Sequence, residues 1–121
     1  MVKLCVPEAE SAALLAHLVE HRRTISSELT VVEVARAAFR AAGGPGLAKA
    51  EQACARLDLL AMSGPILARA RTLGPAALRS LDAIHLATAL EPRTPPVVVA
   101  YDDRLLQAAR AHDLQTVSPG R

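Results

Sequence analysis

The sequence predicts an α/β layered fold with a mainly parallel sheet, and three observations support this prediction. Short apolar or β-branched segments alternate along the chain with longer segments of helical periodicity, as in parallel strands joined by helices. Residues 97–101 (Val-Val-Val-Ala-Tyr) form a continuous apolar run, which is typical of a parallel strand covered on both faces. Residues 79–90 are rich in Ala and Leu and lack Gly and Pro, which predicts a helix buried on several sides.

The composition narrows the class of protein. A chain of 121 residues that is 51% hydrophobic is long enough for one core and too apolar to be disordered, so we expect residues 1–121 to form one domain. A net charge of +2 permits nucleic-acid binding, whereas one Tyr and one Phe disfavour recognition by base stacking. We interpret Cys5 and Cys54 as free structural thiols. Since we find no signal peptide and no membrane-length apolar run, we expect a cytoplasmic protein with no membrane association.

The N-terminal half predicts two helical regions separated by a short strand. A helix begins at residues 7–11, where Pro precedes acidic residues, and ends near the basic residues 21–23, which include Arg22. Residues 24–27 predict a strand, and Ser27 or Thr30 can cap the helix that follows it. That helix ends at Gly43-Gly44-Pro45-Gly46, where another begins and runs to about residue 57.

The C-terminal half alternates strands and helices in the same way. Pro and Gly punctuate it, and the apolar runs between them are short. In chain order we expect a strand at 57–61, a helix opened by Ser63-Gly64-Pro65 and closed at 74–75, the helix 79–90, a loop at 91–96, the strand 97–101, a helix after Asp103, and a strand at 114–117.

Asp82, near the start of the helix 79–90, is the first candidate for chemistry. A carboxylate among apolar neighbours is costly unless a helix N-terminus, a base or a metal ion compensates it. The alternative is that Asp82 only complements the positive end of its own helix. We interpret His85, one turn later, as a hydrogen-bonded core histidine rather than a ligand, because no second His lies at metal spacing.

Two further acidic residues are candidates, each with a structural alternative. Asp102 directly follows the strand 97–101, and ligands of open parallel sheets gather at the carboxyl ends of the strands. Its alternative role is to cap the next helix. Glu33 lies at helical spacing from Arg36 and Arg40, so its alternative role is in a solvated ion-pair face.

Five segments together form a recognisable set of motifs. They are Leu81–Ala89, Val98–Leu105, Val117–Gly120, Ser26–Val34 and Met1–Glu8. In this order they resemble the PIN-domain family, and more closely its VapC-type ribonuclease toxins, over essentially the whole chain. The resemblance implies a PIN-like three-layer α/β/α sandwich with a mainly parallel sheet.

The resemblance also implies a function. Such proteins are Mg²⁺- or Mn²⁺-dependent endoribonucleases, the toxins of type II toxin–antitoxin pairs, so it implies an RNA substrate and a cognate antitoxin. The positions that match the family's acidic residues are Glu33, Asp82 and Asp102, which we expect to bind the metal and to be catalytic. Glu28 is the less favoured glutamate, and Asp103 matches a variable position. The high content of Ala, Leu and Val further predicts exposed apolar surface and a homodimer.

The sequence departs from the family pattern at its start. The family's first strand carries an aspartate, and neither Glu8 nor Glu10 matches that motif, so we expect this first strand to be absent from residues 1–121. Our preferred explanation is a start codon assigned too far downstream, so that upstream codons encode an apolar strand followed by Asp. The alternative is a truncated, catalytically inactive PIN-like remnant that acts as a protein-binding module. A third hypothesis is an unrelated α/β binding domain whose acidic residues are caps and surface pairs.

Overall fold

A computed structural model describes residues 1–21 and 23–121, which form six helices and four short strands. Arg22, predicted to belong to the basic end of the first long helix, lies outside the described residues. In chain order the elements are α1 (Val2–Cys5), α2 (Ser11–Glu20), β1 (Ile25–Ser27), α3 (Leu29–Cys54), β2 (Asp58–Leu60), α4 (Gly64–Ala70), α5 (Ser80–Ala89), β3 (Val98–Val99), α6 (Asp103–Ala111) and β4 (Thr116–Val117).

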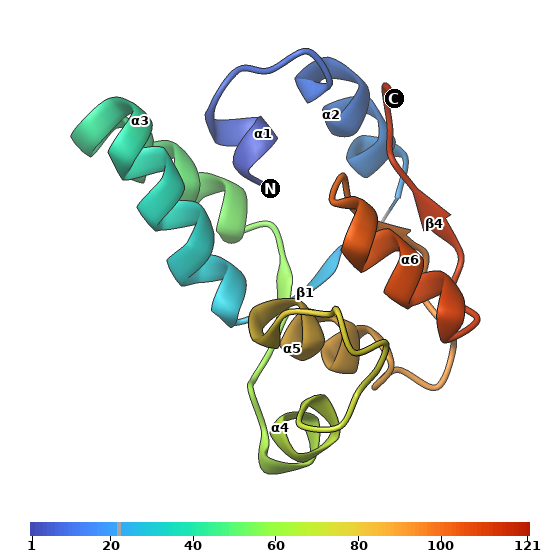
Figure 1. Ribbon diagram of the computed structural model, residues 1–121. Helices are drawn as coiled ribbons and strands as arrows, with labels where there is room; N and C mark the ends of the chain where they lie inside the picture. The colour runs from blue at the N-terminus through green and yellow to red at the C-terminus, as the bar shows by residue number, and fades with distance from the viewer. Residues whose placement is uncertain (22) are drawn as a thin grey trace. The chain divides into compact units, whose positions relative to one another are not determined.

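The chain divides into two compact units, and each is described by itself. Unit 1 comprises residues 1–59 and 119–121, and unit 2 comprises residues 60–118. In Figure 1, unit 1 runs from α1 to the end of α3, and unit 2 begins with α4. The single domain predicted for residues 1–121 stays a prediction.

Helix α3 in unit 1 is a hairpin of two helical arms. The backbone is non-helical at Ala42 and at Gly43, where φ is 60° and ψ is −142°. Glycine adopts such a positive φ without the steric penalty that a side chain brings. Figure 1 shows the two arms side by side. The helix break predicted at Gly43-Gly44-Pro45-Gly46 is thereby confirmed.

The core of unit 1 is built from small and medium side chains. Val34 and Ala38 on the first arm of α3 cluster with Ala50 and Cys54 on the second arm, and Cys5 of α1 belongs to the same cluster. Because these side chains are short, the helices that carry them pack at close range. Helix α1 had no counterpart among the predicted elements, yet it contributes to this core.

Helix α2 begins at Ser11, the last residue of the predicted start at 7–11. The residues just before it form a turn. The backbone N–H of Glu8 donates to Ser11 Oγ at 2.9 Å, and Ser11 Oγ donates to the carbonyl of Lys3 at 2.5 Å. The hydroxyl of Ser11 therefore ties the start of α2 to α1.

Strands β1 and β2 form one two-stranded sheet. The backbone N–H of Asp58 donates to the carbonyl of Thr24 at 2.8 Å, and Arg23 Nε donates to Asp58 Oδ2 at 2.6 Å. The strands predicted at 24–27 and 57–61 are confirmed, with slightly shorter bounds.

Strands β3 and β4 of unit 2 form a second two-stranded sheet and run parallel, as predicted. Val98 pairs with Thr116 and Val99 pairs with Val117. The strand is shorter than the predicted 97–101, and no residue of that range is fully buried. The physical reason is that β3 pairs with a single neighbour in the part of the chain that the structure describes.

The helices of unit 2 enclose its core. Leu86 of α5, Ala108 and Ala109 of α6, and Leu114 form its buried cluster. The predicted burial of α5 is confirmed, since only its first two residues are exposed. Helix α4 ends at Ala70, earlier than the predicted 74–75. Among residues 1–21 and 23–121 there is no helix with both the length and the apolar character that crossing a membrane requires.

A glycine substitution tests the close packing of the α3 hairpin. A Cβ atom added at Gly46 would lie 2.1 Å from the backbone oxygen of Ala38, so the arms would have to separate. We expect Gly46→Ala to lower the free energy of unfolding by about 1–3 kcal/mol, as overpacking does. Gly44→Ala is the matched control, because a Cβ there meets nothing within 4 Å, and we expect it to stabilise by about 0.4–1 kcal/mol. Urea denaturation measures the free energy of unfolding of both variants. Equal stability of the two would contradict the close contact between Gly46 and Ala38.

Candidate functional site

The three predicted site residues lie on different elements. Glu33 is on the first arm of α3 in unit 1, whereas Asp82 on α5 and Asp102 before α6 belong to unit 2. Glu33 and Asp82 are half-buried, and Asp102 is exposed. Neither unit by itself gathers three His, Cys, Asp or Glu side chains into a metal-binding group, within residues 1–21 and 23–121.

Asp82 lies in the first turn of α5. Arg79 is the N-cap residue, and its side chain makes no capping hydrogen bond, although its carbonyl accepts the backbone N–H of Ala83 at 2.8 Å. A carboxylate in this turn is favoured by the positive end of the helix. The structure therefore supports the helix-dipole role for Asp82, and a half-buried carboxylate in this position is also accessible to a cation.

Asp102 caps α6. Its Oδ1 accepts the backbone N–H of Leu105 at 3.0 Å. A carboxylate has two oxygens with about four lone pairs, so capping by Oδ1 leaves Oδ2 for a cation. The capping alternative is therefore confirmed, and it fixes the orientation of Asp102 without ruling out a role as a ligand.

The backbone of Ala100, two residues before Asp102, is held by one hydrogen bond at its N–H and another at its carbonyl. The N–H of Ala100 donates to the carbonyl of Val117 at 3.2 Å, and Ser118 Oγ donates to the carbonyl of Ala100 at 2.6 Å. These bonds fix the end of β3 against the end of β4. The sequence assigned Ser118 no such role, because the contact joins residues that are far apart in the chain.

The start of α3, which positions Glu33, is fixed by hydroxyl groups. The N-cap residue of α3 is Glu28, so neither Ser27 nor Thr30 is the cap that the sequence predicted. Ser27, one residue earlier, nevertheless accepts the backbone N–H of Leu29 on its Oγ at 3.1 Å. The hydroxyls of Ser26 and Thr30 lie 2.5 Å apart and share a hydrogen bond. Ser27 and Thr30 are both buried, so these bonds are shielded from water.

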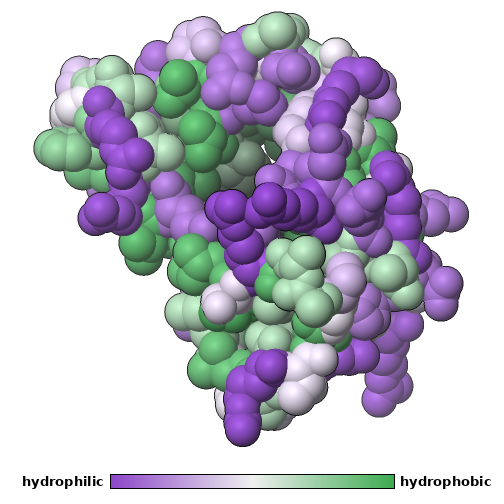
Figure 2. All heavy atoms as spheres, in the orientation of Figure 1, coloured by the Kyte–Doolittle hydropathy of each residue, from purple (hydrophilic) through white to green (hydrophobic). Residues whose placement is uncertain are grey.

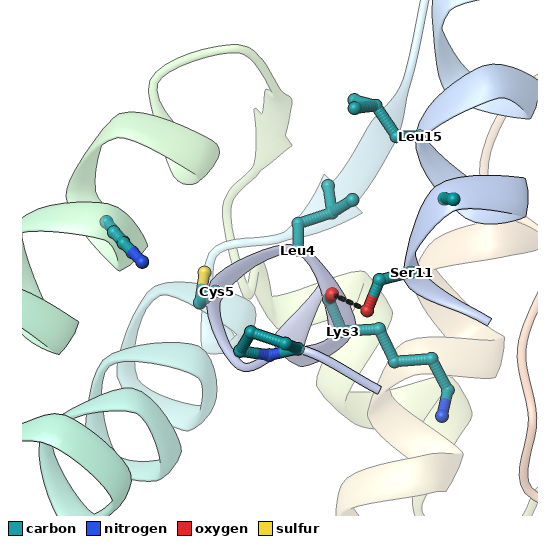
Figure 3. Close-up of a pocket in the computed structure, with 8 residues that line it drawn as sticks. Lys3, Leu4, Cys5, Ser11 and Leu15 are labelled. Carbon is teal, nitrogen blue, oxygen red and sulfur yellow. Dashed lines mark hydrogen bonds between the residues drawn. The ribbon is translucent and has the colours of Figure 1, made fainter. Parts of the chain in front are cut away.

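An ionic cluster in unit 1 was not foreseen from the sequence. The amine of Lys3 donates to the carboxylates of Glu8 and Glu10. These hydrogen bonds raise the pKa of Lys3, and the bond from Lys3 lowers the pKa of Glu10. Figure 3 shows the adjoining bond between Ser11 and Lys3, which borders a hollow of about 290 Å³. This cluster ties α1 to α2 at an exposed position, where ion pairs contribute little to stability.

The two cysteines are free thiols in the core of unit 1. Cys5 is 4% exposed and Cys54 is 8% exposed. Burial raises the pKa of both thiols, so they stay protonated at neutral pH. Because the thiolate is the form that attacks electrophiles and binds metal, these cysteines are suited to packing rather than to chemistry.

A larger hollow in unit 1 has apolar walls. It measures about 490 Å³, and its lining includes Leu15, Leu18 and Val19 of α2, with Lys49 of α3 and Arg56, which follows that helix. Figure 2 shows apolar side chains gathered over α1 and the neighbouring arms of α3. None of the three predicted site residues lines this hollow, so it is a surface distinct from the acidic residues.

Comparison with known proteins identifies a protein family and several related proteins. Residues 6–111 match the family described as PIN domain, which confirms the predicted PIN-like α/β fold class. The chain is 43% identical to Ribonuclease VapC35 of Mycobacterium tuberculosis (strain H37Rv), over 100% of this chain and 93% of that protein. It is 40% identical to Ribonuclease VapC46 of the same strain, over 98% and 92% of the two chains. Ribonuclease VapC47 of M. tuberculosis (strain CDC 1551) is 38% identical over 99% and 92%. No solved structure matches the chain.

The capping role of Asp102 can be measured separately from any role in catalysis. We expect Asp102→Ala to lower the free energy of unfolding by about 0.5–2 kcal/mol, because the N–H of Leu105 loses its acceptor. Asp102→Asn is the matched control and should stay within a few tenths of wild type, since Asn caps helices about as well as Asp. Chemical denaturation without added metal measures both variants. An equal loss of unfolding free energy in Asp102→Ala and Asp102→Asn would show that the charge of Asp102, and not its capping bond, stabilises this turn.

Proposed function

This chain belongs to the PIN-domain family, and we propose on that premise that it is a metal-dependent endoribonuclease, the toxin of a type II toxin–antitoxin pair. The observation that carries the proposal is the match to proteins named ribonuclease along the whole chain. The segment that matches the PIN domain, residues 6–111, contains Glu33, Asp82 and Asp102. We propose these three residues as the metal-binding and catalytic set.

The chemistry of these residues fits a hard divalent cation. Mg²⁺ and Mn²⁺ prefer carboxylate oxygens, and Mg²⁺ keeps several of its waters. Glu33, Asp82 and Asp102 are half-buried or exposed rather than sealed in apolar cores, so each can reach a hydrated ion. When bound, the cation supplies an activated water and positive charge against the developing charge on the phosphate and the leaving oxygen.

Two features of the chain bear on the proposed site. Three carboxylates repel one another and would repel an RNA phosphate, so the proposed activity requires a cation. The bond from the N–H of Leu105 holds Asp102 in one orientation before any ligand arrives. Hydrolysis then adds the water oxygen to phosphorus, breaks one phosphorus–oxygen bond of the RNA, and transfers a proton to the leaving oxygen.

We also propose two protein partners, a second copy of the chain and an antitoxin. The predicted apolar surface is present in the structure. Large apolar side chains that are more than half exposed include Val19 at 77%, Phe39 at 57% and Val32 at 54%. Val32 and Phe39 are seven positions apart on the first arm of α3, so they lie on one face of that helix. Exposed apolar groups that lie together commonly belong to protein interfaces, which supports the proposed dimer and antitoxin.

Metal binding is the first test of the proposed function. We expect Mg²⁺ or Mn²⁺ to raise the melting temperature by mass action, and Asp82→Asn to remove most of that increase. The apo form of this variant should be as stable as wild type or more stable, because repulsion between carboxylates falls. Asp103→Asn is the matched control, since Asp103 also lies in the first turn of a helix, and it should keep the full increase.

RNA cleavage is the second readout on the same proteins. Whatever RNA cleavage the wild-type chain shows with a divalent cation should persist in Asp103→Asn and be lost in Asp82→Asn, Glu33→Gln and Asp102→Asn. Metal binding without cleavage by the wild-type chain would favour the protein-binding module. An apo Asp82→Asn variant that is strongly destabilised would instead identify Asp82 as a purely structural charge.

The oligomeric state tests the proposed partner surface. We expect light scattering to give the mass of a dimer. We expect Phe39→Glu to shift the population toward monomer, because it places a charge on the exposed apolar side of α3 that we propose as the dimer contact. Glu51→Lys changes an exposed charge on the same helix without adding or removing apolar area, so it serves as the control. A monomer at high concentration would contradict the dimer and leave the nuclease proposal unaffected.

A further inference from the structure

The parallel sheet of unit 2 ends close to Asp102. The backbone N–H of Val98 donates to the carbonyl of Gln115 at 2.8 Å. Two residues later, the N–H of Ala100 donates to the carbonyl of Val117 at 3.2 Å. The ladder between β3 and β4 therefore reaches Ala100, one residue beyond the end of β3.

A proline stops the backbone from continuing this ladder. In a parallel ladder, a residue donates its N–H to the neighbouring strand and accepts at its carbonyl from the residue two positions further along that strand. The residue that would donate to the carbonyl of Ala100 is Pro119, and proline has no N–H. Ser118 Oγ donates to this carbonyl instead, at 2.6 Å. The hydroxyl of Ser118 therefore supplies the donor that the backbone lacks at this position.

Strand β4, which leads into Ser118, is itself fastened to α6. Arg110 Nε of α6 donates to Thr116 Oγ1 of β4 at 2.9 Å, and Figure 1 shows β4 beside α6. Asp102 is held to the same helix, because its Oδ1 accepts the N–H of Leu105. The hydroxyl of Ser118 thus extends from a strand that is anchored to the helix that Asp102 caps.

These bonds limit the orientations that are open to Asp102. Only Tyr101 separates Ala100 from Asp102, so the peptide of Ala100 sets the direction in which the chain approaches the carboxylate. With Ala100 held at its N–H and its carbonyl, and Oδ1 held by the helix, Oδ2 is oriented before any ligand arrives. A ligand group that is oriented in advance loses less conformational freedom on binding, which strengthens the affinity.

We propose that Ser118 is a positioning residue of the metal site. Its hydroxyl acts through the carbonyl of Ala100 and holds Asp102 in the orientation that binds a divalent cation. Ser118 does not itself bind the cation in this proposal. The inference rests on the proposed function, because it takes Asp102 as a metal ligand.

The test measures the Kd for Mn²⁺ by calorimetry on the 121-residue chain, together with the free energy of unfolding without metal. Ser118→Ala removes the donor, and we expect the Kd to rise on the order of 10-fold, the lower end of the effect of removing groups that hold metal ligands in place. Ser118→Thr keeps a hydroxyl at the same position. Because Ser118 is half-buried rather than enclosed, the added methyl group can be accommodated, and the Kd should stay close to that of wild type.

A hydroxyl in unit 1 supplies the matched control. Ser11 Oγ also donates to a backbone carbonyl, that of Lys3, at 2.5 Å, whereas Asp102 belongs to unit 2. We expect Ser11→Ala to lower the free energy of unfolding and to leave the Kd for Mn²⁺ unchanged, since it removes a bond of the same kind that does not hold Asp102.

The outcomes separate this inference from the proposed function. A wild-type Kd in Ser118→Ala, or an equal rise of the Kd in Ser118→Thr or Ser11→Ala, would overturn the positioning role and leave the proposed function standing. A wild-type chain that does not bind Mn²⁺ would overturn the proposed function, and the role of Ser118 with it.

Discussion

The structure depends on how closely helices can approach when their contact surfaces consist of small side chains. The sequence has one Phe and one Tyr, and Phe39 is exposed rather than buried. The fully buried positions are largely Ala, as at Ala38, Ala87 and Ala109. An alanine core buries little area per residue, so it gains packing energy only when backbones come close together. The α3 hairpin meets this requirement at Gly46, where no side chain separates the second arm from the carbonyl of Ala38.

Two of the three proposed site residues lie at the starts of helices. Asp82 and Asp102 both lie where a helix begins, and the positive end of a helix stabilises a carboxylate there. This lowers the cost of keeping the half-buried charge of Asp82. The same negative charges that complement the helices are the ones that we propose to bind a divalent cation. In that proposal, one side chain combines a structural and a functional role.

Hydroxyl groups hold the backbone near these residues. Ser118 bonds to the carbonyl of Ala100, two residues before Asp102, and Ser27 bonds to the first residue of the helix that carries Glu33. In both places a hydroxyl satisfies a backbone group where regular structure ends, which is where the chain is otherwise least constrained. These bonds suit the function that we propose, because a metal-dependent hydrolase needs its carboxylates held in place before substrate binds.

The sequence by itself determined the order and type of nearly all elements. Apolar periodicity, the Gly43-Gly44-Pro45-Gly46 run and the Val-rich segment 97–101 act through local geometry, so they can be read without knowing what packs against them. The motif set also identified the family and the candidate residues Glu33, Asp82 and Asp102. The short N-terminal helix α1 escaped prediction, because its few residues are held by packing against α3 rather than by their own propensity.

Only the tertiary structure decided which distant groups meet. It showed that the second arm of α3 folds back onto Ala38, that the N–H of Asp58 bonds to the carbonyl of Thr24, and that Ser118 bonds to the carbonyl of Ala100. It also shortened β3 to two residues, since a strand extends only as far as its partner allows. Periodicity specifies which face of an element is apolar, but not which other face covers it. That choice depends on the path of the whole chain and on the exclusion of water from the contacts it creates.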